Sequence, residues 1–250
     1  MGSDFKVDLE LAMDASPDQV WDAIATGPGI DSWFMGRTEV TPGVGGTVRT
    51  TFGEYRPTST ITAWNPGQRL AYSTTADPDG RRVGYEFLIE GRAGGSTVLR
   101  MVTSGFLPGD DWADEYETMA KGLQMFLHTL REYVTHFPGR AATTTTAFAP
   151  MPSDWRTDWT TLLGVLGVNL PVQQDDRVDV TPDGLPPIDG VVYFTNADTI
   201  GVRTDDALYR FLGGNIGPIN VSHHLFADHV HQEAIEAAWT AWLARVLGGR

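Results

Sequence analysis

Four of the six histidines lie in one short stretch near the C-terminus, between Ser222 and His231. Imidazole groups at this density can bind zinc or nickel. The spacing is not one of the usual zinc signatures, and on a strand the adjacent His223 and His224 point to opposite faces. We therefore expect no metal site and ordinary polar roles at a strand end and a helix cap, with metal binding as the alternative.

Other residue patterns that carry catalysis are missing from the sequence. The chain has no cysteine, which excludes disulfides, thiol nucleophiles and thiolate metal sites. It also has no phosphate-binding glycine loop, nucleophile elbow or dinucleotide fingerprint. The acidic pairs at 110–111, 175–176 and 205–206 are more typical of helix N-termini or solvated loops than of acid/base pairs. No cofactor is expected.

A few polar side chains interrupt otherwise apolar, strand-like segments. Tyr72, Tyr85, Arg100 and Thr103 could provide acid/base or oxyanion contacts to a substrate. For Arg100 the alternative is an exposed strand position, since arginine usually lies on the surface. Whether these residues catalyse any reaction is left open by the sequence.

Charge and hydropathy limit the partners. The net charge is −14 without a basic patch, so nucleic acid and anionic membranes are not expected as partners. The first residues lack an apolar core of signal-peptide length, and no run approaches the roughly 18 apolar residues of a spanning helix. We therefore expect a cytoplasmic protein.

Helix signals begin near the N-terminus. Ser16 is typical of an N-cap, with Pro17 at the first helical position and Gln19 closing a capping box. Residues 26–29 end that helix, and a second short helix leads to Trp33 and Phe34.

Strand patterns surround these two helices. Residues 5–13 alternate between apolar and polar, and turn residues then separate strand-like segments at 36–40, 46–52, 58–64, 69–75, 82–90 and 96–103. A long amphipathic helix follows Asp111 and ends before Pro138. The predicted order is strand, two helices, an antiparallel meander and one long helix.

This order over residues 5–137 resembles the START-like (SRPBCC, pollen-allergen-like) superfamily, and within it the branch named after the activator of the heat-shock chaperone ATPase. Local similarities lie at residues 45–48, 61–70, 103–106 and 121–123. The resemblance implies an α+β helix-grip fold, in which a curved antiparallel β-sheet wraps around the long C-terminal helix. Two residues depart from the family pattern: Thr103 stands where histidine is common, and Leu123 replaces a tryptophan.

Such a sheet encloses an apolar interior that one helix cannot fill, and apolar cavities with a few polar groups hold small ligands. We expect the ligand-binding residues to be Trp33, Phe34, Tyr72, Tyr85, Phe87, Arg100, Met101, Met119, Leu123 and Phe126. The alternative is that the apolar ones form an ordinary core.

After Pro138 the sequence loses its helical periodicity. The predicted divisions are a helix-grip domain over 1–138, a linker over 139–152, and a smaller α+β unit over 153–250. In that unit Ser153 is expected to cap a helix, strands are expected at 177–181, 190–194, 199–203 and 218–226, a short helix at 207–212, and a last helix from His231. A decayed repeat of the first domain is one interpretation. Its expected role is docking on the first domain or formation of a homodimer.

Three functions remain. The leading one is binding of a small apolar or aromatic molecule between the sheet and the long helix. The second, implied by resemblance, is an enzyme like the polyketide cyclases and aromatases of the superfamily. The third is a protein-interaction role like that of the chaperone-ATPase activator. A shared fold alone does not decide among them.

Overall fold

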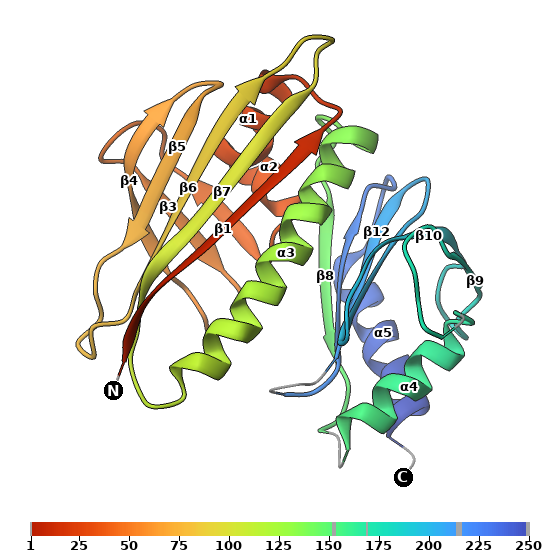
Figure 1. The fold of residues 1–250 in the computed structure, drawn as a ribbon. Helices are drawn as coiled ribbons and strands as arrows, with labels where there is room; N and C mark the ends of the chain where they lie inside the picture. The colour runs from red at the N-terminus through yellow and green to blue at the C-terminus, as the bar shows by residue number, and fades with distance from the viewer. Residues whose placement is uncertain (1, 152–153, 169, 214–216, 249–250) are drawn as a thin grey trace. The chain divides into compact units, whose positions relative to one another are not determined.

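The computed structural model describes residues 2–151, 154–168, 170–213 and 217–248. Contacts divide the chain into two units, Met1–Ala141 and Ala142–Arg250, which Figure 1 shows in red to green and in green to blue. Each unit contains one antiparallel sheet and its own helices.

The first unit follows the predicted order of elements. Its local signals are confirmed at the first helix: the Ser16 hydroxyl accepts a hydrogen bond from the Gln19 N–H, and the Gln19 side chain accepts one from the Ser16 N–H. The elements are β1 (Ser3–Met13), α1 (Pro17–Ala25), α2 (Gly27–Asp31), β2 (Arg37–Val40), β3 (Thr47–Thr51), β4 (Thr58–Asn65), β5 (Arg69–Thr74), β6 (Arg82–Gly91), β7 (Thr97–Leu107) and α3 (Trp112–His136).

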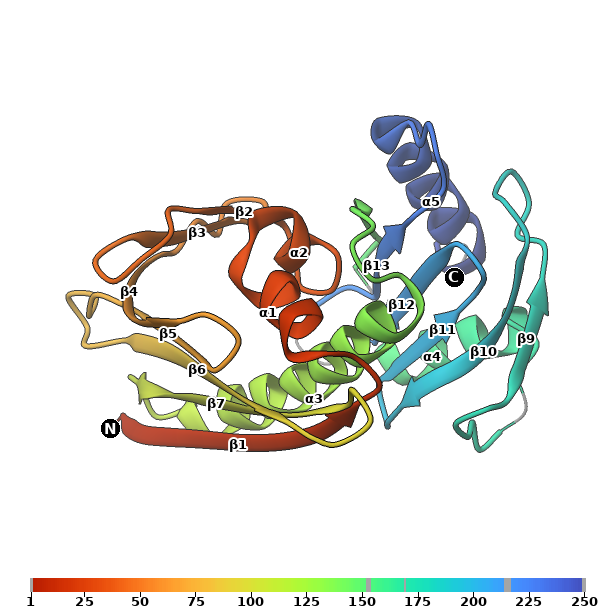
Figure 2. The ribbon, with the colours of Figure 1, turned by 90° about the horizontal axis from the view of Figure 1, so that it is seen from above.

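The strands of the first unit form one antiparallel sheet in the order β1-β7-β6-β5-β4-β3-β2. The first strand therefore pairs with the last one, while the others follow as hairpins. Figure 2 shows this sheet curving around α1, α2 and α3. This is the α+β helix-grip fold, and its concave face is where a ligand site would be built.

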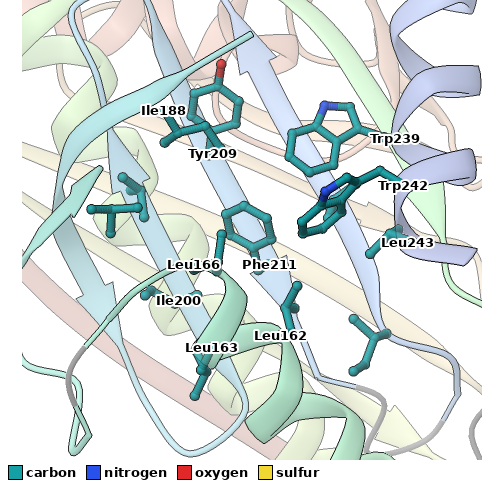
Figure 3. Packing of buried hydrophobic residues seen from close by; sticks show 14 of the residues in the cluster. Leu162, Leu163, Leu166, Ile188, Ile200, Tyr209, Phe211, Trp239, Trp242 and Leu243 are labelled. Carbon is teal, nitrogen blue, oxygen red and sulfur yellow. The ribbon is translucent and has the colours of Figure 1, made fainter. Parts of the chain in front are cut away.

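The second unit contains β8 (Thr143–Phe148), α4 (Trp155–Val165), β9 (Arg177–Val180), β10 (Ile188–Thr195), β11 (Thr199–Arg203), β12 (Ala207–Leu212), β13 (Asn220–Leu225) and α5 (Gln232–Leu247). Its sheet order is β8-β13-β12-β11-β10-β9, so its first strand also pairs with its last one and the others follow in reverse order. The second unit thus repeats the strand arrangement of the first. Residues of α4 and α5 share one hydrophobic core with the sheet, part of which Figure 3 shows.

Two sequence expectations about this region were wrong. The run 207–212, expected as a helix, is strand β12, because pairing with both β11 and β13 overrides the helix signal of the preceding aspartates. The expected linker contains β8, whose β-branched threonines pair with β13. Ser153, the expected cap, lies outside the described residues, and Asp154 is the N-cap of α4.

Candidate ligand-binding site

Trp33 and Phe34 lie directly after α2 and differ in their roles. Trp33 is buried, and its Nε1 donates a hydrogen bond to the Ala23 carbonyl oxygen at 2.9 Å. Phe34 is only half-buried. Gly36, with φ of 71°, then brings the chain so close to the Thr51 carbonyl that a Cβ atom would lie 2.3 Å from that oxygen. Trp33 is thus fixed in the core, while Phe34 is held at the edge of the interior.

The concave face of the sheet carries a row of hydroxyl groups. In the antiparallel register Tyr72 of β5 pairs with Tyr85 of β6, and Tyr85 pairs with Thr103 of β7. Paired residues project to the same face of a sheet. The next row on this face contains Phe87, opposite Met101.

Aromatic rings connect this sheet face to the helices. Phe34 lies with ring centroids 6.3 Å from Tyr85 and 4.5 Å from Phe126 of α3. Tyr72 contacts both Tyr85, at 5.4 Å, and Phe87, at 6.2 Å. Trp33 contacts Phe34 and Phe87 at 5.2 and 6.4 Å. The six rings form one connected cluster, which we call the aromatic cluster.

A cavity of about 60 Å³ lies beside this cluster. Its lining includes six hydroxyl-bearing residues: Thr50, Tyr55, Ser59, Tyr72, Thr74 and Tyr85. The remaining lining residues are apolar: Phe34, Met35, Val48, Pro57 and Val83. Since none of these residues is charged, the cavity suits a neutral group with hydrogen-bonding oxygen atoms.

The hydroxyl groups of the concave face differ in their surroundings. The Thr103 hydroxyl is fully buried and has no hydrogen-bond partner among the described residues. Tyr72 and Tyr85 line the cavity, and their hydroxyls make no hydrogen bond within the described part of the chain. Burial raises the pKa of both tyrosines well above the usual range, so each phenol stays protonated at neutral pH. These phenols can therefore donate hydrogen bonds, but they cannot act as general bases.

The structure does not bring all predicted site residues together. Arg100 points to the other face of the sheet, where its guanidinium makes two hydrogen bonds to the Asp8 carboxylate. The direction of the Arg100 side chain follows from strand alternation, because Arg100 and its neighbour Met101 cannot face the same side of the sheet. Arg100 is therefore separated from the aromatic cluster, which corrects the expectation from the sequence.

The other predicted residues lie in the interior. Phe87, Met101 and Leu123 are almost fully buried, while Met119 and Phe126 of α3 are partly buried. Of the ten predicted residues, those that line the cavity are Phe34, Tyr72 and Tyr85.

Sequence reasoning missed the contribution of β3, β4 and the turn between them. Thr50 of β3, Ser59 of β4 and the exposed Tyr55 of the turn line the cavity. Period-two alternation would have placed Thr50 beside Val48 on one face. It would not have shown that the sheet curves far enough to bring this face opposite Phe34.

The histidine-rich segment is spread over different environments. His223 and His224 are buried neighbours in β13, and His223 packs against Trp239 with ring centroids 4.6 Å apart. Burial and the nearby Arg210 hold the pKa of His223 well below its usual value. His229 and His231 lie beyond the strand. Among the residues that the structure describes, no group of three or more histidine or carboxylate side chains could hold a metal ion.

The helices within the described ranges include none that is both long and apolar enough to span a bilayer.

Comparison with known proteins agrees with this fold. Residues 14–135 match the family described as activator of Hsp90 ATPase homolog 1-like protein. No curated protein matches the chain significantly.

Several solved structures resemble the chain. Protein MLL2253 from Mesorhizobium loti is 24% identical with a TM-score of 0.45, over 51% of this chain and 95% of that one. The Aha1 dimer from Colwellia psychrerythraea is 20% identical with a TM-score of 0.42, over 52% of this chain and 96% of the other. DynU16, a protein in the dynemicin biosynthetic locus, is 18% identical with a TM-score of 0.44, over 97% and 98% of the two chains.

Proposed function

Because residues 14–135 make the first unit a member of the activator-of-Hsp90-ATPase-like branch of the START-like superfamily, we propose that this unit binds a small neutral aromatic ligand between its sheet and α3. The ligand carries hydroxyl or carbonyl oxygens. It lies against the aromatic cluster and is held by the hydroxyls of Tyr72 and Tyr85.

The unpartnered hydroxyls carry this proposal. Tyr72 and Tyr85 pair across β5 and β6 and both line the cavity, and neither hydroxyl makes a hydrogen bond within the described residues. A hydrogen bond between neutral groups typically contributes about 0.5–1.5 kcal/mol. A ligand oxygen that accepts hydrogen bonds from these two hydroxyls would gain this contribution, while its aromatic body would cover the exposed edge of Phe34.

The size of the cavity sets a condition on binding. Ligand pockets usually measure about 300–1,000 Å³, whereas this cavity is about 60 Å³. The ligand must therefore widen it. The turn that carries Tyr55 and Pro57 is the wall that we expect to move, since the Tyr55 side chain is 57% exposed.

Cyclase-like catalysis is the second candidate, and the protonated phenols favour it. A phenol that donates a hydrogen bond to a substrate carbonyl can stabilise a developing oxyanion. Tyr72 and Tyr85 would fill that role, because both line the cavity and burial raises the pKa of each phenol still further above neutral pH. A base would then have to come from the substrate or from water.

Two further expectations accompany the proposal. A cytoplasmic location is compatible with the absence of cysteine. A homodimer is the protein partner that we expect, as the Aha1 protein from Colwellia psychrerythraea is described as a dimer.

Native mass spectrometry of the freshly purified protein tests occupancy and oligomeric state together. A mass above that of the denatured chain, together with a neutral aromatic compound in the extract, would support the proposal. An extract that contains an acyl chain or a charged metabolite instead would contradict the assigned ligand class.

A further inference from the structure

A second and larger cavity lies entirely within the second unit. Its volume is about 450 Å³, within the range of about 300–1,000 Å³ usual for small-molecule pockets. It lies at one end of the unit, between β12, the end of β13, the segment 227–231 and the first turn of α5. It shares no residue with the cavity of the first unit.

The floor of this cavity is apolar. Leu225, Ala207 and Ile235 provide aliphatic surface, and Pro186 and Pro187 form a wall. Such a surface accommodates the hydrocarbon part of a ligand, because removing apolar surface from water is favourable.

Tyr209 provides a buried polar group that points toward the cavity. The residue is only 5% exposed, and its ring packs against His223 and Trp239 at 4.8 and 6.3 Å. Figure 3 shows its oxygen directed away from Phe211 and the two tryptophans. No described residue makes a hydrogen bond with this hydroxyl, although Tyr209 lines the cavity. The hydroxyl oxygen is open to the cavity, so a ligand in the cavity can pair with it.

The rim of the cavity is acidic. Asp206 and Asp228 both line it together with His229 and His231, and its lining includes no lysine or arginine. Asp206 is held in place: its Oδ1 accepts a hydrogen bond from the Thr204 hydroxyl at 3.1 Å, and its carbonyl oxygen accepts one from the Phe226 N–H at 2.8 Å. The two carboxylates make the cavity attractive to a positive charge.

From these observations we propose that the cavity of the second unit is a separate binding site for an organic cation, a primary amine attached to an aromatic or aliphatic body. The ammonium group lies at Asp206 and Asp228 and donates a hydrogen bond to the Tyr209 oxygen. The hydrocarbon body covers Leu225 and Ile235. This proposal does not depend on the ligand of the first unit.

Three probes of matched shape test the required charge. Phenethylamine, 2-phenylethanol and phenylacetate are titrated into the full-length protein to about 10 mM, and binding is followed by amide NMR shifts at residues 227–231 and 234–235. We expect phenethylamine to bind at least about tenfold more tightly than the alcohol, since charge-assisted hydrogen bonds are the stronger ones. Phenylacetate is expected not to bind. Equal affinities for all three probes, or no shift at these residues, would overturn the proposal.

Substitutions then locate the site. Ala234→Phe places a ring in the cavity from an exposed helix position, and Ala237→Phe places the same ring on α5 at an exposed position outside the lining. Phenethylamine binding should disappear in the first variant and persist in the second. Asp206→Asn and Tyr209→Phe should each weaken phenethylamine at least about threefold and leave the alcohol unchanged. Persistent amine binding in Ala234→Phe would show that the amine binds elsewhere.

Discussion

The rings of Phe34 and Phe126 lie 4.5 Å apart, with an angle of 51° between their planes. Phe34 also contacts Tyr85 of the sheet at 6.3 Å. It therefore connects the long helix to the row of hydroxyls on the concave face. A half-buried ring in this position is suited to cover a ligand on one side while it contributes to the core on the other.

Replacing Phe34 should affect stability and ligand binding together. Phe34→Ala removes contacts to three rings, and we expect a loss of about 2–4 kcal/mol in the free energy of unfolding, near the range for buried phenylalanine. Ligand affinity should fall at least about tenfold. Urea unfolding and ligand titration measure the two effects.

Trp21→Ala provides the control for this variant. Trp21 packs edge-on against Trp64 at 5.0 Å, and neither residue lines the cavity. The Trp21→Ala substitution should lower the free energy of unfolding without changing ligand affinity. If both variants weakened ligand binding equally, the loss would reflect general destabilisation and not a contact to the ligand.

Removing one hydroxyl should weaken ligand binding without lowering stability. Tyr85→Phe deletes an oxygen that has no hydrogen bond in the described part of the protein, so the free energy of unfolding should stay within about 0.5 kcal/mol or rise. Affinity for the ligand should fall about five- to tenfold, the usual contribution of one hydrogen bond. Calorimetric titration measures this affinity. A marked loss of stability would mean that the hydroxyl has a partner without the ligand.

Arg100 should be dispensable for binding. Its guanidinium pairs with Asp8 on the outer face and holds the pKa of that carboxyl well below its usual value. Because exposed ion pairs contribute little to stability, Arg100→Gln should leave both the melting temperature and the ligand affinity close to those of the unsubstituted protein. A reduced affinity in this variant would place Arg100 back among the ligand contacts.

Asp31 should give the first unit a measurable pH dependence. Its Oδ1 accepts a hydrogen bond from the Thr38 N–H at 2.6 Å, yet burial outweighs this effect and raises the pKa to about 6 from a usual value of 3.8. The folded state therefore binds more protons between these two values. The stability that protonated Asp31 contributes is fully present below about pH 4 and is lost as the pH rises through 6.

Asp31→Asn should remove this dependence and keep the acceptor for Thr38. We expect the variant to be more stable by about 1–2 kcal/mol at pH 7, a value reduced for partial exposure, with the difference vanishing near pH 4. Urea unfolding at intervals from pH 4 to pH 8 measures it. A constant difference between the two proteins over this range would exclude Asp31 as the titrating group.

Local signals predicted much of the first unit. The capping box of Ser16 and Gln19 depends on neighbouring residues alone, so it could be read from the sequence. Strand alternation likewise put Tyr85 and Phe87 on one face. Alternation also separates Arg100 from Met101, but the partner of Arg100 became apparent only from the register of β7 with β1.

Long-range pairing explains what the sequence did not reveal. Residues 207–212 have aspartates before them and could begin a helix, but two neighbouring strands hold them extended. The threonines at 143–146 looked like a linker because their partner strand β13 lies far along the chain. The cavity wall at Thr50, Ser59 and Tyr55 depends on the curvature of the whole sheet, which no local pattern contains.

The most direct test of ligand binding in the first unit is an amide NMR titration with 2-naphthol, a neutral hydroxylated aromatic, compared with the anion 2-naphthoate. We expect saturable shifts for residues around Phe34, Tyr72 and Tyr85, with 2-naphthoate binding at least about tenfold more weakly because the residues that line the cavity carry no positive charge. Stronger binding of the anion, or shifts confined to the second unit, would contradict the proposed binding site.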